Sequence, residues 1–189
     1  MTVADKFSIV VLFFLIATQL FNRNFPVKYV KFCFFLSIAA MFFAASYSAF
    51  LQYEAWKTNP MSVFLLPPHA SWTYFAWYVI PRFFSPLLVA VISALILKIV
   101  SEFLNKRFGE RFLEKEEGWL LATGIFMSGY PGLLFYVPLM LVSGLFLSIF
   151  YSALKKGRAP FFYLWLPVAV FAILLKSQIP QSVLNNFII

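Results

Sequence analysis

Side chains capable of acid–base, nucleophilic or metal chemistry are scarce in this chain. Its 189 residues include one aspartate, Asp5, one histidine, His69, and one cysteine, Cys33. An aspartate pair therefore cannot form, and a single cysteine supports neither an intrachain disulfide nor a cysteine-rich metal site. His69 follows two prolines and is expected at the surface, not in a zinc site or a catalytic triad. Because no serine has a visible base and no glycine-rich phosphate loop occurs, we expect no cofactor and no bound metal.

The composition indicates an integral membrane protein. Hydrophobic residues make up 62% of the chain, aromatic residues 21% and charged residues only 12%. A soluble domain of this size would need more polar surface, so soluble enzymes, disordered proteins and nucleic-acid-binding proteins are excluded. The net charge of +8 is attributed to membrane topology and lipid headgroup contact, which makes membrane lipids the expected partners and nucleic acid none.

Hydrophobic runs predict the membrane-spanning helices. They cover about residues 7–22, 29–51, 74–98, 118–154 and 159–176. The first run lacks a basic leader and a cleavage site, so it is interpreted as a retained helix and not as a signal peptide. The long fourth run contains the turn-forming residues 128–132, which divide it into two helices. The prediction is an all-α protein with six transmembrane helices in a single transmembrane domain, residues 1–189.

The basic residues predict the orientation. With six spans, eleven of them fall on one side and three on the other, and the side rich in Lys and Arg should be cytoplasmic. The protein is therefore expected in the plasma (inner) membrane as a multi-pass protein with both termini extracytoplasmic. The larger set comprises Arg23, Lys28, Lys31, Lys98, Lys106, Arg107, Arg111, Lys115, Lys155, Lys156 and Arg158; the smaller comprises Lys6, Lys57 and Lys176. Arg82, between Pro81 and Pro86, is expected to be a snorkelling or locally paired residue near the outer end of a kinked helix, in preference to a functional residue.

The helix around residue 118 presents a length problem. From Gly118 to Gly129 it would measure only about 18 Å, too short for a hydrocarbon core of about 30 Å. We therefore expect it to begin at or before Leu113, with Glu116 and Glu117 in its first turns, where acidic side chains suit the helix dipole. Residues 98–117 before it are amphipathic and are expected to lie along the inner membrane surface, supported by Glu102 and Lys106 four residues apart.

Unusual polar residues near the inner face stand in two segments, and both resemble a known family. Residues 17–30 resemble the first signature of the type IV prepilin peptidases, in which a helix ends in an aspartate followed by basic residues; Gln19 occupies the aspartate position. Residues 114–124 resemble the second signature, Gly-x-Gly-Asp followed by Leu-Leu-Ala and a glycine. Glu117 occupies that aspartate, and both glycines before it are glutamates.

Two further segments extend the resemblance along nearly the whole chain. Residues 129–132 resemble the Gly-Trp-Pro break between the family's fourth and fifth helices, and residues 159–162 resemble the Pro-Phe step that opens its sixth. The resemblance implies the six spans and the orientation of the family's small members. It also implies that Gln19 and Glu117 approach each other at a cytoplasmic cleft, whose candidate lining residues are Gln19, Asn22, Arg23, Glu116 and Glu117.

The chain departs from this family at the chemistry itself. The family's enzymes cleave leader peptides with two aspartates, and a glutamine cannot hold or transfer the proton that an acid pair shares. The expected function is therefore that of a catalytically inactive, prepilin-peptidase-like subunit that binds a pilin-like helix or other subunits of a pilus, secretion or other membrane assembly. Two alternatives remain: an active peptidase that uses Glu117 with Glu116 or a substrate group, or an unrelated small structural or transport subunit.

The orientation can be tested by cysteine accessibility. In a Cys33→Ser background, a cysteine introduced beside Lys156 should be protected from a membrane-impermeant maleimide in intact cells, and one beside Lys57 should react. Labelling of the position beside Lys156 from outside would overturn the predicted orientation.

Overall fold

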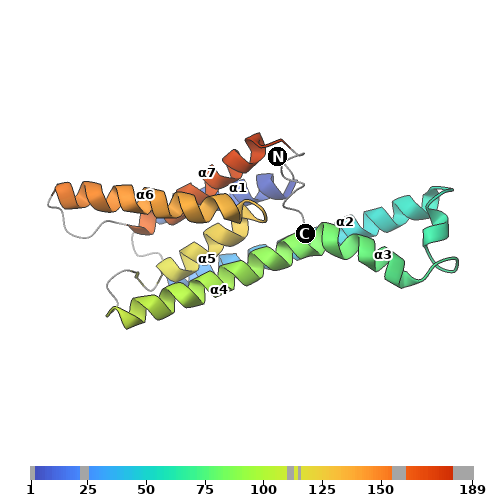
Figure 1. The fold of residues 1–189 in the computed structure, drawn as a ribbon, viewed down its shortest axis with the longest axis horizontal. Coiled ribbons are helices and arrows are strands. Elements are labelled where there is room, and N and C mark those ends of the chain that lie inside the picture. The colour runs from blue at the N-terminus through green and yellow to red at the C-terminus, as the bar shows by residue number, and fades with distance from the viewer. Residues whose placement is uncertain (1–2, 22–25, 110–112, 115, 155–160, 181–189) are drawn as a thin grey trace.

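In the computed structural model, the described residues are 3–21, 26–109, 113–114, 116–154 and 161–180. Their regular structure is entirely helical, as expected (Figure 1). The helices in chain order are α1 (Val3–Phe21), α2 (Val27–Thr58), η1 (Val63–Leu65), α3 (Trp72–Val79), η2 (Ile80–Phe84), α4 (Ser85–Arg107), α5 (Glu117–Ser128), α6 (Leu133–Ala153), η3 (Phe161–Tyr163) and α7 (Trp165–Gln178).

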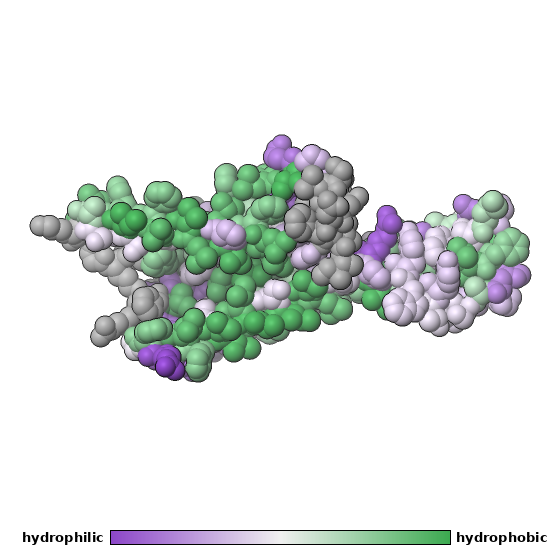
Figure 2. Space-filling view, in the orientation of Figure 1, coloured by the Kyte–Doolittle hydropathy of each residue, from purple (hydrophilic) through white to green (hydrophobic). Residues whose placement is uncertain are grey.

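Five helical segments of the described chain are long and apolar enough to cross a membrane. They are α1, α2, the continuous α3–η2–α4 segment, α6 and the η3–α7 segment. Large apolar side chains are exposed along these helices, as on α2, α4 and α6, and apolar residues dominate the bundle face in Figure 2. This pattern is compatible with a multi-pass membrane protein whose outer surface faces lipid.

The short helix α5 differs from the sequence prediction. It begins at Glu117, so the expectation of a start at or before Leu113 is wrong. Its 12 residues span about 18 Å, less than the hydrocarbon core. A helix of this length is stable here because ten of its twelve residues are buried by α1, α2, α4, α6 and α7. The length argument assumed contact with lipid, whereas α5 is enclosed by protein.

Hydrogen bonds from side chains keep the backbone before α5 in a non-helical conformation. The Asn105 side chain accepts a hydrogen bond from the Leu113 N–H at 2.9 Å and donates one to the Leu113 carbonyl at 2.8 Å. The Glu114 N–H donates to the Glu117 carboxylate at 3.1 Å, as in the backbone half of a capping box. Since both backbone groups of Leu113 bond to Asn105, a helix that continued back to this residue would have to break those bonds.

The segment 98–117 also differs from its prediction as a separate surface helix. Its first ten residues continue α4 without a break to Arg107. Glu102 pairs with Lys98, one turn earlier, at 2.7 Å. The predicted connector is therefore largely the end of a spanning helix, because the apolar stripe of α4 continues past Lys98 through the exposed Ile99 and Phe103.

The predicted turn at residues 128–132 is confirmed. α5 ends at Ser128 and α6 begins at Leu133. Gly129 has a φ of 61°, which favours glycine. A β-carbon on Gly132 would lie 2.2 Å from the Ser128 carbonyl oxygen, so a larger residue would force the backbone apart.

Small residues let the helices around α5 approach closely. Ala90 and Ala94 of α4 and Ala169 and Ala172 of α7 are buried in the shared core. Gly124 of α5 lies against the hydroxyl of Tyr136. Between helices in a membrane, close van der Waals packing replaces the hydrophobic effect as the source of association, so these small side chains stabilise the bundle.

Two helices are longer than a bilayer requires. α2 has 32 residues and the α3–η2–α4 segment has 36, about 48 and 54 Å respectively. Their excess length forms a hairpin beyond the other helices, on the right of Figure 1, and this hairpin is less apolar than the bundle in Figure 2. We call residues 45–84 the projecting hairpin.

Aromatic contacts hold the projecting hairpin together. The Trp56 ring lies 4.8 Å from Tyr78, and the Tyr53 ring stacks on Trp72 at 5.6 Å. Arg82 occupies the π-helical segment η2, which contains Pro81, a residue that cannot donate a backbone hydrogen bond. Its guanidinium lies 5.6 Å from the Tyr78 ring centroid, so the expectation of a locally paired arginine in an irregular helix is confirmed.

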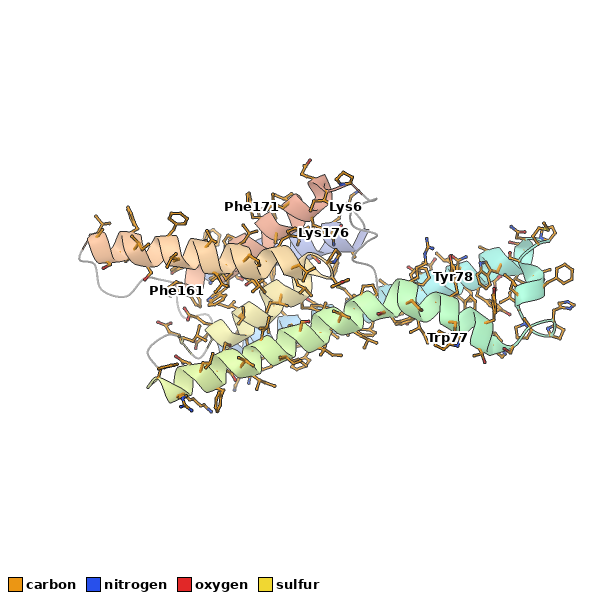
Figure 3. All side chains as sticks on the ribbon, viewed as in Figure 1. Lys6, Trp77, Tyr78, Phe161, Phe171 and Lys176 are labelled. Carbon is orange, nitrogen blue, oxygen red and sulfur yellow. The ribbon has the colours of Figure 1, made fainter. Side chains whose placement is uncertain are left out.

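A buried ion pair joins the two ends of the described chain. Lys176 of α7 donates to Asp5 of α1 at 2.6 Å, and both side chains are largely buried. Figure 3 shows Lys6 and Lys176 next to each other, where α1 begins and α7 ends. The first turns of α1 and the last turn of α7 therefore lie on one side of the bundle.

The Asp5–Lys176 pair should contribute to stability. Lys176→Met removes the cation from a buried carboxylate and should lower the free energy of unfolding by about 3 kcal/mol, measured by denaturation in detergent micelles. Asp5→Leu combined with Lys176→Met should recover much of this loss, because no lone charge is left buried.

The exposed i,i+3 pair Glu54–Lys57, at 4.0 Å, provides the control. Lys57→Met should change the free energy of unfolding by less than about 1 kcal/mol. Equal effects of the two single substitutions would show that the buried pair has no special role.

Candidate functional site

The candidate residues lie where α1 ends and α5 begins. Gln19 lies in the last turn of α1, Glu117 in the first turn of α5, and Glu116 directly before it. Asn22 and Arg23 fall outside the described residues. α5 packs against both α1 and η3, so the two family acid positions lie on elements that are in contact.

Gln19 is held by the backbone of a distant segment. Its side chain is 2% exposed, and its amide Nε2 donates to the Phe162 carbonyl oxygen at 2.6 Å. A carbonyl oxygen can only accept, so a donor is required at this place. An ionised carboxylate here would bring two acceptors together without a proton between them.

Glu117 is also buried, at 2% exposure, and its carboxylate accepts a hydrogen bond from the backbone just before the helix. Oε2 accepts the Glu114 N–H at 3.1 Å, while the Glu117 N–H donates to the Glu114 carbonyl at 3.1 Å. A carboxylate in the first helical turn also interacts favourably with the positive end of the helix dipole. Glu116 is only partly buried, and its carbonyl accepts the N–H groups of Trp119 and Leu120.

Gln19 and Glu117 therefore both make hydrogen bonds to the backbone that order this end of the bundle. Gln19 ties α1 to η3, and Glu117 ties the start of α5 to the segment before it. That the two side chains also approach each other across a cleft stays a prediction. In chemical terms the pair consists of one amide and one carboxylate, which cannot share a proton as two carboxyl groups do.

A further cluster at the start of α5 was not predicted from the sequence. Two ammonium groups lie near the Trp119 ring: Lys98 Nζ of α4 is 4.5 Å and Lys31 Nζ of α2 is 5.1 Å from its centroid. We call Lys31, Lys98 and Trp119 the lysine–indole cluster. Glu102 pairs with Lys98 at 2.7 Å and lies against Gly118.

The sequence holds only an indirect signal for this cluster. Trp and Lys residues near the ends of spanning helices are typical of membrane interfaces. Lys31 and Lys98 are 67 residues apart in the sequence and lie near the same ring. Their proximity depends on how α2, α4 and α5 pack together, which no local motif encodes.

His69 and Cys33 are the remaining side chains that the sequence analysis considered for catalysis or metal binding. His69 lies beside the Phe64 ring at 5.1 Å, in the projecting hairpin. Cys33 is partly buried on α2. Among the residues that the structure describes, no group of three or more His, Cys, Asp or Glu side chains lies close enough to hold a metal ion.

Comparisons with protein-family models, with curated protein sequences and with solved structures give no match. Functional inference for this chain therefore depends on its own residues and their geometry.

The Gln19 contact makes a testable prediction. Gln19→Glu replaces the amide donor by a group that is an acceptor when ionised, and should lower the free energy of unfolding by about 1–3 kcal/mol at pH 8. Only the protonated acid can donate to the Phe162 carbonyl, so the loss should shrink at pH 5 and grow as the pH rises. Denaturation of the purified protein at both pH values measures the effect.

The exposed Gln178 provides a matched control with the same change in charge. Gln178→Glu should be neutral within about 0.5 kcal/mol at both pH values. If Gln19→Glu changed the free energy of unfolding as little as Gln178→Glu, the Gln19–Phe162 hydrogen bond would not contribute to the stability of the fold.

Proposed function

We propose that this protein is a non-catalytic, prepilin-peptidase-like membrane subunit that binds other membrane proteins. Its partners are pilin-like helices or further subunits of a pilus, secretion or other membrane assembly. It resides in the inner membrane with six helical passes, α5 being the short one, and with both termini on the extracytoplasmic side. The position of both ends of the described chain on one side, joined by Asp5 and Lys176, supports this topology.

The observation that carries the proposal is the use of the two family acid positions. Water activation by an acid pair needs two carboxyl groups that face a common substrate and exchange one proton. Here the first position is a buried amide engaged with the Phe162 carbonyl. The second is a buried carboxylate engaged with the backbone at the start of its own helix. Both groups therefore contribute to the fold in the way expected of a protein that has lost catalysis.

The projecting hairpin supports a role in binding. Its aromatic side chains are exposed well beyond the helices of the bundle, with Trp77 at 76%, and Figure 3 shows Trp77 and Tyr78 on α3, away from the other labelled residues. Trp and Tyr are enriched in protein–protein interfaces and at membrane interfaces. A rigid aromatic element of this kind is suited to contact a neighbouring subunit.

The alternative of an active peptidase with a glutamate pair is less favoured by the contacts. That alternative pairs Glu117 with Glu116 or a substrate group; Glu102 of α4, which lies against Gly118, is a further carboxylate near the start of α5. It forms an ion pair with Lys98 at 2.7 Å, so this carboxylate is already engaged with a cation of its own helix.

The proposal is tested by a leader-peptidase assay. The protein, reconstituted in liposomes with a prepilin-type substrate, should release no more cleaved product than liposomes without protein, and an active aspartyl prepilin peptidase serves as the positive control. In the same liposomes, a labelled helix from that substrate should crosslink to the protein. Cleavage that disappears in Glu117→Ala or Glu116→Ala would contradict the proposal and establish the glutamate alternative.

A further inference from the structure

The lysine–indole cluster carries a positive charge that the described part of the chain does not balance. Lys98 is 12% exposed and has its counter-ion in Glu102. Lys31 is exposed, and among the described residues no carboxylate lies within salt-bridge distance of it. Trp119 holds both ammonium groups near its ring, because the ring quadrupole attracts cations. The cluster therefore presents a positioned, accessible cation.

The surface beside the cluster is apolar and exposed. On α2, Phe32 is 65% and Phe35 55% exposed; on α4, Ile99 and Phe103 are each 62% exposed. In a chain that spans a membrane, such side chains face the acyl chains of lipids. Lys31 lies four residues after the start of α2, about 6 Å along the helix, so its ammonium lies close to the level where the helix leaves the apolar layer.

A cation at the edge of an acyl-facing surface matches the chemistry of a lipid headgroup. We propose that the lysine–indole cluster binds the phosphodiester of an anionic phospholipid, with Lys31 as the direct contact and the acyl chains along Phe32 and Phe35. A zwitterionic lipid would bring its own ammonium group toward Lys31 and Lys98, so the cluster favours a headgroup with a net negative charge. This site does not depend on the proposed function.

Lipid binding can be measured directly. The purified full chain in a neutral detergent, at near-physiological salt, is titrated with phosphatidylglycerol or with phosphatidylcholine of the same acyl chains, and bound lipid is counted by native mass spectrometry. The wild type should bind phosphatidylglycerol about fivefold or more tighter than phosphatidylcholine, the factor expected when one basic residue contacts an anionic lipid. Equal affinity for the two lipids would overturn the proposal.

Charge variants locate the site. Lys31→Gln should lose the preference for phosphatidylglycerol, and Lys31→Arg should keep it. Lys106→Gln removes the same charge from an exposed residue at the same end of α4 and should leave the preference intact. An equal loss in Lys106→Gln and Lys31→Gln would show diffuse attraction and overturn the proposed site.

Two controls distinguish a lipid site from a site for free phosphate and from a purely structural role of Lys31. Inorganic phosphate at the concentration of the lipid should not displace phosphatidylglycerol, and full displacement would assign the cluster to free phosphate instead of lipid. Lys31 is exposed, so the thermal unfolding temperature of lipid-free Lys31→Gln should match that of the wild type. A lower unfolding temperature together with a retained lipid preference would assign Lys31 to the fold and overturn the proposal.

Discussion

The enclosure of α5 is the constraint on which the rest of this structure depends. A helix of 12 residues cannot cross a bilayer, and its unpaired terminal backbone groups cannot be left in lipid. The other helices surround it, and backbone carbonyls before it accept its first N–H groups: the Glu114 carbonyl accepts from Glu117, and the Glu116 carbonyl accepts from Trp119 and Leu120. The buried alanines of α4 and α7, and the glycines of α5, are the side chains that let those neighbours come close enough.

The start of α5 shows how this constraint recruits residues from distant parts of the chain. Asn105 binds both backbone groups of Leu113, Glu117 binds the Glu114 N–H, and Gln19 secures the Phe162 carbonyl in η3, which packs against α5. Each of these contacts satisfies a backbone group at the end of the bundle where α5 begins. Of the candidate site residues, Gln19 and Glu117 are therefore also residues that the fold needs there.

Much of the architecture was predictable from the sequence because it follows from local patterns. Apolar runs indicate the spanning helices, and the cluster Ser128–Gly132 indicates the break before α6 because glycine and proline act on their own backbone. The start of α5 was predicted wrongly because its short length is permitted only by burial among other helices. The extension of α4 to Arg107 was missed because a spanning helix that continues and a surface helix share the same amphipathic pattern. The lysine–indole cluster could not be found because three separate helices form it.

The hydrogen bond of Gln19 shows what an amide contributes to the fold at this position. An acid pair at a catalytic site repels itself when both members are ionised, and enzymes keep it because the reaction requires it. An amide in place of one acid removes that repulsion and adds a donor, which here meets the Phe162 carbonyl. An ionised acid at position 19 would place its carboxylate next to the Phe162 carbonyl, so that two hydrogen-bond acceptors would face each other in a buried environment. This would oppose the packing of η3. The donor that the Phe162 carbonyl requires therefore accounts for glutamine at this position by stability alone.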